Sequence, residues 1–456
     1  MTSSERVRRA CAGWFAAETH PLNLAVVRIM VFGILLDRLL SGGFRRFARL
    51  PEELRILPPG IDAVLRVIPL NEQTLSVVQI AAAVFALLAL IGLKTRPAAG
   101  LACVLSSYVL GVPYLFGKVD HTLHHIIWFS ALLAASPSGD ALSLDAWLAR
   151  RRGAPPPAPA RAYALPIRLM WLLIGVAYFF PGLYKLRACP RWITSDNFQL
   201  LLYESWRHHG VLPALRVDLH PWLCHAAAAG TILFELGFIF LVLPRRTRPF
   251  AAVAGLLFHA STAYFMRIYF LELALCYVVF VDWHGLAQRL RPALAQSQAQ
   301  SQAQPQSAPA TPDWRPSAVI GSALLVVSVF CGALRIDSWP FSVYPRFDRI
   351  HTHPTTTKLE AALESSAGST PLRLPLRGAL LQRTARLPEG EERDRRLRAL
   401  AELLVRDRDD LRPGDSLRVY AATYSTLPER WREPPLRRHL LFDYAAGRHV
   451  EPRTQP

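Results

Sequence analysis

Long apolar runs separated by short polar segments occupy the first three quarters of the chain. Most of these runs are about 20 residues long, the length that a helix needs to cross the hydrocarbon core of a bilayer. The pattern therefore predicts an all-α polytopic membrane protein with about nine transmembrane helices. We expect these helices near residues 22–40, 75–93, 97–116, 121–136, 163–186, 221–243, 248–265, 267–283 and 316–334, of which 121–136 is short for a span.

The last quarter of the chain is polar and has a different pattern. Residues 389–406 repeat apolar positions with the period of a helix, and residues 417–424 alternate like a strand. We expect a small α+β extracytoplasmic domain that is accessory to the membrane part. The predicted organisation is a transmembrane domain at 1–290, a cytoplasmic linker at 291–315, a last transmembrane helix at 316–335 and the C-terminal domain at 336–456.

The positive charges of the chain lie mostly in loops that flank the apolar runs. The formal net charge is +18, although 52% of the residues are hydrophobic. Because the basic residues are dispersed along these loops, anionic membrane lipid is the expected partner and nucleic acid is not. Loops with Lys94 and Arg96, Arg150 to Arg152, Arg245 to Arg248 and Arg289 to Arg291 fall on the side of the N-terminal arginines. The positive-inside rule then predicts a cytoplasmic N-terminus and an extracytoplasmic C-terminus.

Lysine is rare in this chain, and one of its lysines ends an apolar run. The lysines are Lys94, Lys118, Lys185 and Lys358, and Lys185 closes the run 167–186. A charged group there is either an anchor whose ammonium extends to the headgroups or part of a functional site. A desolvated lysine can lose its proton, whereas arginine effectively cannot. The position of Lys185 therefore fits both an anchor and a base.

Three histidines open the predicted span at 121–136. His121, His124 and His125 share one helical face, which Trp128 continues at the next turn. Imidazoles in this arrangement could ligate a metal or donate hydrogen bonds to a ligand oxygen. The H-x-x-H-H spacing matches a box of membrane di-iron desaturases, so a di-iron oxidase is one alternative. The further histidine boxes of such enzymes are missing, and we expect no bound metal.

Other polar residues interrupt the later apolar runs. Glu235, His259 and Glu272 each lie within a predicted span, where such residues commonly form hydrogen bonds between helices. The predicted orientation places a set of these residues at one depth, in the outer half of the membrane: His121, His124, His125, Lys185, His259 and Glu272. Glu235 lies deeper. This convergence predicts one shared site in a cavity that opens outward.

Several spaced motifs together resemble the HTTM (horizontally transferred transmembrane) domain family, the membrane core shared with vitamin K-dependent gamma-carboxylase. The motifs are Tyr178-Phe179-x-x-Gly182-Leu183-x-Lys185-Leu186 with Trp192, Asn23-Leu24-Ala25 with Arg28, His125 with Ser143-Leu144-Asp145, and Phe234-Glu235 with His259. The resemblance covers roughly residues 15–285 and rests on these motifs read together. It also suggests a protein of the bacterial plasma (inner) membrane.

The resemblance implies a chemistry through its carboxylase branch. There a lysine that matches Lys185 is thought to act as a base on vitamin K hydroquinone, after which oxygenation produces a stronger base and carbon dioxide is added to glutamate. His125 and His259 would assist catalysis by polarising the quinone oxygens. The cofactor, reduced vitamin K or another quinone, would be bound by His121, His124, Trp128, Glu235 and Glu272.

Three functions stay open on the sequence. The first is a gamma-carboxylase-like lyase or ligase that uses a reduced quinone, with Lys185 as the base. The second is a non-catalytic protein that binds quinone or lipid or holds an unidentified protein partner. The third is the di-iron oxidase. The related carboxylase has a much larger lumenal region for its protein substrate, and residues 340–456 are too few to supply all of it.

Overall fold

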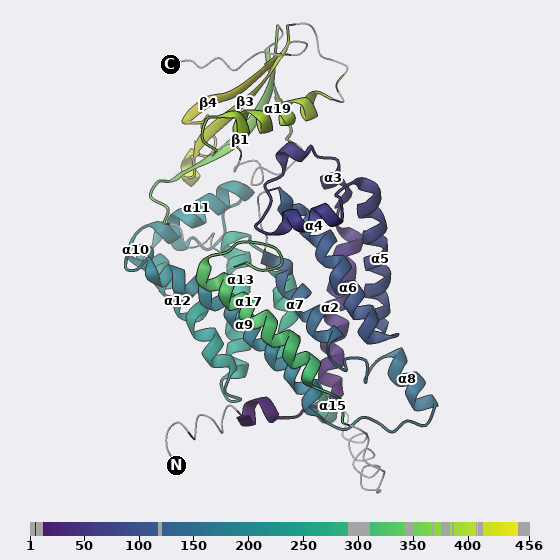
Figure 1. Ribbon diagram of the computed structural model, residues 1–456. Helices are drawn as coiled ribbons and strands as arrows, with labels where there is room; N and C mark the ends of the chain where they lie inside the picture. The colour runs from purple at the N-terminus through teal and green to yellow at the C-terminus, as the bar shows by residue number, and fades with distance from the viewer. Residues whose placement is uncertain are drawn as a thin grey trace.

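The computed structural model describes residues 5, 12–116, 121–290, 311–342, 350–366, 368–374, 384, 387–406, 408 and 414–445, without the side chain of His121. Most of the predicted linker at 291–315 therefore lies outside the described residues. The described part is a bundle of helices with a small sheet at one end (Figure 1).

Six helices among the described residues are long and apolar enough to cross a bilayer. They are α5 (Glu72–Ile91), α6 with η2 (Thr95–Leu115), α9 (Arg161–Arg187), α12 (Pro221–Val242), α13 (Arg248–Met266) and α17 (Arg315–Leu334). The predicted count of about nine spans is not confirmed. These six helices still indicate an integral membrane protein, because an apolar helix of about 20 residues has the length that is needed to cross a bilayer core.

The three remaining predicted spans differ from the six for two reasons. Helix α2 (Pro21–Ser41) is long enough, but it carries Arg28, Asp37 and Arg38. Arg28 is fully buried and donates hydrogen bonds to three backbone carbonyls at 2.5–3.3 Å, which makes α2 an internal helix. The other two are short: α7 (His124–Ala134) has 11 residues, and α14 (Leu271–Leu275) continues into η5 (Cys276–Phe280). At 1.5 Å per residue each covers about half of a bilayer core.

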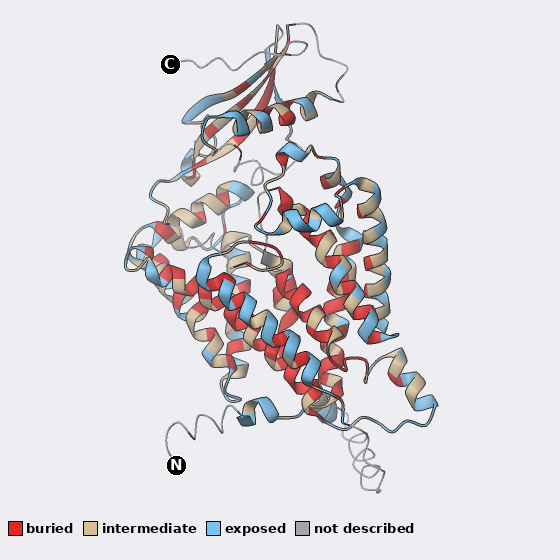
Figure 2. Cartoon of the chain, viewed as in Figure 1, coloured by how far each residue is buried: buried red, intermediate tan, exposed pale blue. Residues whose placement is uncertain are grey.

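Helix α9 is the centre of the bundle. Its apolar window is 78% buried, against 17–28% for α12, α13 and α17, and Figure 2 shows buried residues concentrated along the inner helices. Neighbours of α9 include α12, α17, α2 and α7. Helices α12, α13 and α17 therefore leave most of their surface to the lipid. A residue near the end of α9, such as Lys185, is held inside the bundle.

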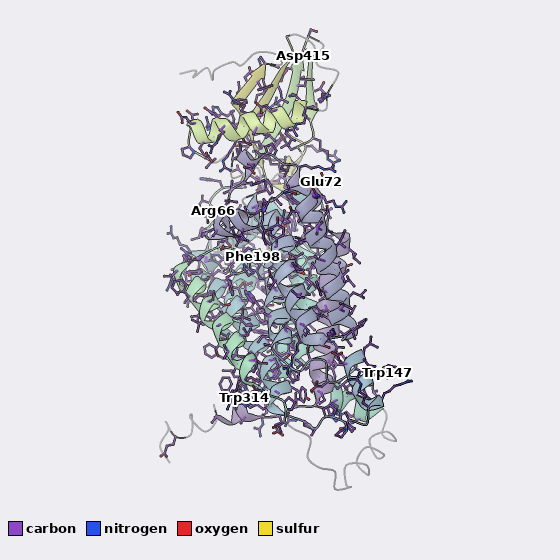
Figure 3. The ribbon with its side chains drawn as sticks, turned by 45° about the vertical axis from the view of Figure 1, so that its right-hand side comes forward. Arg66, Glu72, Trp147, Phe198, Trp314 and Asp415 are labelled. Atoms are coloured by element: carbon purple, nitrogen blue, oxygen red, sulfur yellow. The ribbon has the colours of Figure 1, made fainter. Side chains whose placement is uncertain are left out.

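The connecting segments gather at two ends. At one end Trp14 donates to the carbonyl of Leu243 at 3.0 Å, and the carboxylate of Asp145 accepts from the backbone of Lys94 at 2.9 Å. Trp147 and Trp314 lie at this end, while Arg66 and Glu72 lie at the other, below the sheet (Figure 3). The first end holds α8 (Leu144–Arg151) and α15 (Trp283–Leu290). The second holds α3 (Arg45–Ala48), η1 (Glu52–Leu54), α4 (Ile61–Val67), α10 (Arg191–Thr194), α11 (Asn197–His209) and η4 (Val217–Leu219).

The C-terminal part is an antiparallel four-stranded sheet with a helix packed on it. The strand order is β2-β1-β3-β4, with β1 at Thr355–Ser365, β2 at Gly368–Leu372, β3 at Ser416–Ser425 and β4 at Arg437–Ala445. Helix α19 (Glu391–Val405) buries Leu397 and Leu400 in a cluster with Val419 and Phe442. The predicted helix at 389–406 and strand at 417–424 are thus confirmed.

The sheet is joined to the second end of the bundle by polar contacts. The Arg207 guanidinium donates to the carbonyl of Trp431 at 3.1 Å, next to η7 (Pro428–Arg430). The backbone N–H of His351 donates to Asn197 at 2.8 Å. Both membrane-side residues belong to α11, which therefore links the sheet to the helices around the candidate site.

Candidate functional site

Helices α9 and α12 cross closely because α9 presents a glycine at the contact. A Cβ atom built on Gly182 would lie 2.8 Å from the Cβ of Glu235 and 3.0 Å from the backbone nitrogen of Leu236. Real Cβ atoms essentially never come within 2.8 Å of another heavy atom, so a larger residue here would push α9 and α12 apart. The close approach brings Lys185, one turn beyond Gly182, against α12.

Lys185 and Glu235 form a buried ion pair at this crossing. The ammonium of Lys185 donates to Oε1 of Glu235, and the two residues are only 3% and 5% exposed. The ammonium also lies 5.6 Å from the centre of the Trp192 ring, a cation–π arrangement. Lys185 therefore does not extend to the membrane surface as an anchoring lysine would. Oε2 of Glu235 is buried and has no hydrogen-bond partner among the described residues.

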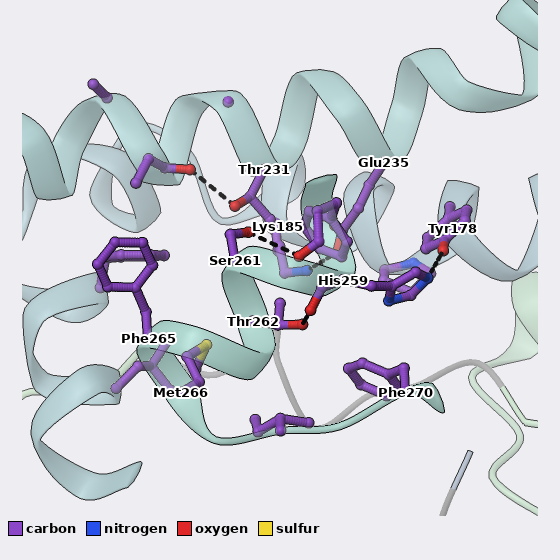
Figure 4. Close-up of a pocket in the computed structure, with 18 of the residues that line it drawn as sticks. Tyr178, Lys185, Thr231, Glu235, His259, Ser261, Thr262, Phe265, Met266 and Phe270 are labelled. Atoms are coloured by element: carbon purple, nitrogen blue, oxygen red, sulfur yellow. Dashed lines mark hydrogen bonds and ion pairs between the residues drawn. The ribbon is translucent and has the colours of Figure 1, made fainter. Parts of the chain in front are cut away.

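The ion pair lies on the wall of a cavity of about 490 Å³ that is lined by α9, α12, α13 and the start of α14, together with residues of α10, α11 and η4. Figure 4 shows Lys185, Glu235 and His259 together, with Phe265, Met266 and Phe270 along the same space. The wall is mostly apolar and aromatic, with a few polar groups, and the volume is that of a small-molecule pocket. The lining residues include Ala177, Pro181, Trp192, Phe198, Val217, Ala227, Gly230, Thr231, Phe258, Ser261, Thr262 and Ile268.

His259 is held at the cavity by a pair of tyrosines. Its Nε2 lies 2.6 Å from the hydroxyl of Tyr178, which in turn lies 3.0 Å from the hydroxyl of Tyr277. Nδ1 of His259 is buried without a hydrogen-bond partner among the described residues. When Tyr178 donates to Nε2, Nδ1 carries the proton and can donate to a ligand; in the other tautomer Nδ1 accepts.

Pro181 adds a further polar feature to the same wall. Proline has no N–H, so the carbonyl of Ala177, four residues earlier on α9, does not receive the usual intrahelical hydrogen bond from this residue. Both residues line the cavity. The residues that line the wall thus include a glutamate, a histidine and a proline that interrupts the hydrogen bonds of α9, within mostly apolar surroundings.

Two of the predicted site residues lie behind His259 rather than on the cavity wall. His125 is fully buried at the start of α7, and α7 packs against α14, the helix of Glu272. The carboxylate of Glu272 turns the other way, to the guanidinium of Arg38 at 2.5 Å. Neither residue is among those that line the cavity. His125 and Glu272 are therefore held in the packing around the cavity and do not face it.

The other predicted residues are not brought to the cavity. The ring of His124 packs edge-on against Trp339 with centroids 4.9 Å apart, and Trp128 donates to the carbonyl of Pro340 at 2.9 Å. Both therefore support the segment that leads from α17 to the sheet. His121 lies in the short helix η3 (His121–Leu123), ahead of α7, and its side chain is outside the described residues. The single site predicted for all these residues is thus divided between the cavity and its surroundings.

The described residues contain no group of three His, Cys, Asp or Glu side chains that could hold a metal ion. The expectation of no bound metal stays a prediction, for which metal analysis of the purified protein is the measurement.

The sequence did not by itself assign Tyr178 a role, although this residue opens the motif that ends at Lys185 and Leu186. The signal in the sequence is the spacing: Tyr178 and Lys185 are seven residues apart, so their side chains lie on the same face of a helix.

Comparison with known proteins gives one match. The family model for the HTTM domain matches residues 17–283. This range includes α2 to η5 and every residue that lines the cavity, and it ends before α17 and the sheet. No curated protein and no solved structure matches the chain.

Proposed function

This chain belongs to the HTTM domain family, and we propose that it is a membrane enzyme that binds a reduced quinone beside Lys185, Glu235 and His259. The match confirms the family that the sequence motifs indicated. The reaction we propose is of the carboxylase type, in which Lys185 takes a proton from a quinol hydroxyl. When bound, a reduced quinone supplies the electrons for reaction with oxygen.

The cavity fits such a molecule on two counts. Its aromatic walls suit a flat apolar ring, which pairs well with side chains such as Phe258 and Phe270. Two buried polar atoms, Oε2 of Glu235 and Nδ1 of His259, have no hydrogen-bond partner among the described residues. Buried polar groups are rarely left unpaired because the loss costs about 1–3 kcal/mol each. A ligand hydroxyl that reaches either atom would supply the missing hydrogen bond.

Glu235 gives Lys185 a way to become a base. A lone ammonium cannot accept a proton, but Lys185 can pass one to the carboxylate that it already contacts. The pair is then neutral, a state that low-dielectric surroundings favour over two separated charges. The amine can next take the hydroxyl proton, which leaves Lys185 charged, Glu235 protonated and the ligand oxygen negative. The ammonium stabilises that oxygen.

His259 has the role of positioning the oxygen. Tyr178 holds the ring through Nε2, which leaves Nδ1 as the ring nitrogen available for a hydrogen bond to a ligand. The alternative of a non-catalytic quinone- or lipid-binding protein uses the same cavity but needs no proton transfer by Lys185.

We expect replacement of His259 by leucine to weaken binding of a reduced quinone about tenfold, the effect of one lost hydrogen bond of roughly 1.4 kcal/mol. The measurement is equilibrium binding of a reduced menaquinone to the protein in lipid nanodiscs. His225→Leu is the matched control, because His225 is a histidine of α12 that does not line the cavity. Equal affinity of the two variants would contradict a role of His259 in binding.

We also propose that the protein lies in a bacterial plasma membrane with its N-terminus in the cytoplasm and its sheet outside. Support comes from the basic residues at the ends of α8 (Arg150 and Arg151) and α15 (Arg289), opposite the sheet. In whole cells, an impermeant thiol reagent should label Arg432→Cys and not Ala154→Cys; both positions are exposed. Labelling of Ala154→Cys alone would reverse the orientation.

A further inference from the structure

The wall of the cavity that α12 contributes is made of small residues that are themselves exposed. Ala226, Ala227 and Gly230 line the cavity and are exposed, as is Ser261 opposite them on α13. We call these four residues the seam. Elsewhere the cavity is closed by buried or half-buried residues such as Lys185, Trp192 and Leu273. The seam is therefore the side on which the cavity meets the surroundings of the bundle.

Gly230 distinguishes the open side of α12 from its packed side. A Cβ atom built on Gly230 would meet no atom within 4 Å, whereas one built on Gly182 of α9 would collide with α12. Helix α12 thus packs tightly on α9 through one face and leaves the face with Gly230 free. Ser261 on α13 does not fill the gap, since its hydroxyl turns back to the carbonyl of Phe258 at 2.8 Å.

The seam lies at the depth of the lipid tails. Gly230 is nine residues after the start of α12 at Pro221, which is about 14 Å along a helix whose full length is about 33 Å. A bilayer core is about 30 Å thick, so this position is close to its middle. An opening there faces hydrocarbon and not water.

We propose that the seam is a lateral opening through which a lipid-dissolved ligand enters the cavity from the bilayer. The ligand class is an amphipathic molecule with a hydrogen-bonding ring and a long apolar tail, an inference that rests on the proposed function for the identity of the ring. The ring passes between α12 and α13 to Lys185 and His259. The tail stays in the seam, where Ala226, Ala227 and Gly230 have no bulky side chains to obstruct it.

A thiol placed inside the cavity tests this route without any quinone. Thr262→Cys provides the thiol, because Thr262 lines the cavity on α13, in a background whose native cysteines are replaced by alanine. A maleimide with a long alkyl chain is dissolved in the vesicle lipid, and its rate of reaction with the thiol is measured. The rate is then compared between Gly230→Leu and Gly237→Leu in this background.

Gly237 is the matched control because it is also on α12, has no atom within 4 Å of an added Cβ and does not line the cavity. We expect reaction in the Gly230→Leu variant to be roughly tenfold slower than in the control, equivalent to an added barrier of about 1.4 kcal/mol. N-ethylmaleimide crosses the bilayer and has no alkyl tail to accommodate beside position 230, so it should react about equally with both variants. Equal rates for the alkyl maleimide in the two variants, or equal slowing of both reagents by Gly230→Leu, would overturn the proposal. If the protein does not bind a reduced quinone but the maleimide rates are as expected, the proposed function fails and the lateral opening stands.

Discussion

Replacing Lys185 with arginine should abolish quinol-dependent activity while the protein stays folded in the membrane. Arginine keeps the positive charge that Glu235 requires, but it cannot release a proton to that carboxylate. General-base catalysis contributes about 10²–10⁴-fold to a rate, so a loss of that size is expected. The measurement is oxygen-dependent oxidation of a reduced quinone by the protein in nanodiscs, followed by absorbance at matched protein concentration.

The control for this substitution is Lys94→Arg. Lys94 is an exposed lysine before α6, and its backbone is held by Asp145 far from the cavity. The same chemical change at this place should leave the rate unchanged. Full activity of the Lys185→Arg variant would eliminate the proton-transfer role and favour the non-catalytic binding function. Lys185→Ala is a less informative variant, because it leaves Glu235 buried without its cation.

Removing Glu235 alone should destabilise the protein far more than removing both members of the pair. A single Glu235→Leu substitution leaves the Lys185 ammonium buried without its carboxylate, which costs roughly 3–5 kcal/mol. Replacing both, with Lys185→Met and Glu235→Leu, removes the two charges together and should restore at least the parent stability. The double variant should nevertheless be inactive. Thermal unfolding in detergent measures the stabilities.

Glu272→Leu provides the comparison for that experiment. Glu272 is equally buried, but its partner Arg38 has a side chain that is 38% exposed. The freed guanidinium can therefore be solvated, and the loss of stability should be smaller than for Glu235→Leu. If the Glu235→Leu variant is as stable as the parent, Lys185 and Glu235 do not form a buried pair, and the proton-transfer proposal would fall with it.

The sequence alone was enough for properties that depend on local pattern. Apolar runs about as long as a bilayer is thick identify a membrane protein whichever helices pack together. Helical and strand periods predicted α19 and β3 within a few residues. Each element has one apolar face, and these faces pack together in the C-terminal domain. Lys185, Glu235 and His259 were also identified as candidates, since ionisable residues within apolar runs are rare and need a reason.

Only the tertiary structure decided which of these residues act together. Lys185 meets Glu235, 50 residues away, because Gly182 lets α9 and α12 approach; helix periodicity carries no information on which helix is the neighbour. Glu272 has the same sequence signature as Glu235, yet Arg38 takes its carboxylate. Helix α7 likewise has only 11 residues because the chain turns at its two ends, which the apolar run in the sequence does not indicate. Partner choice depends on how whole helices cross, a long-range property that local patterns of hydrophobic and polar residues do not determine.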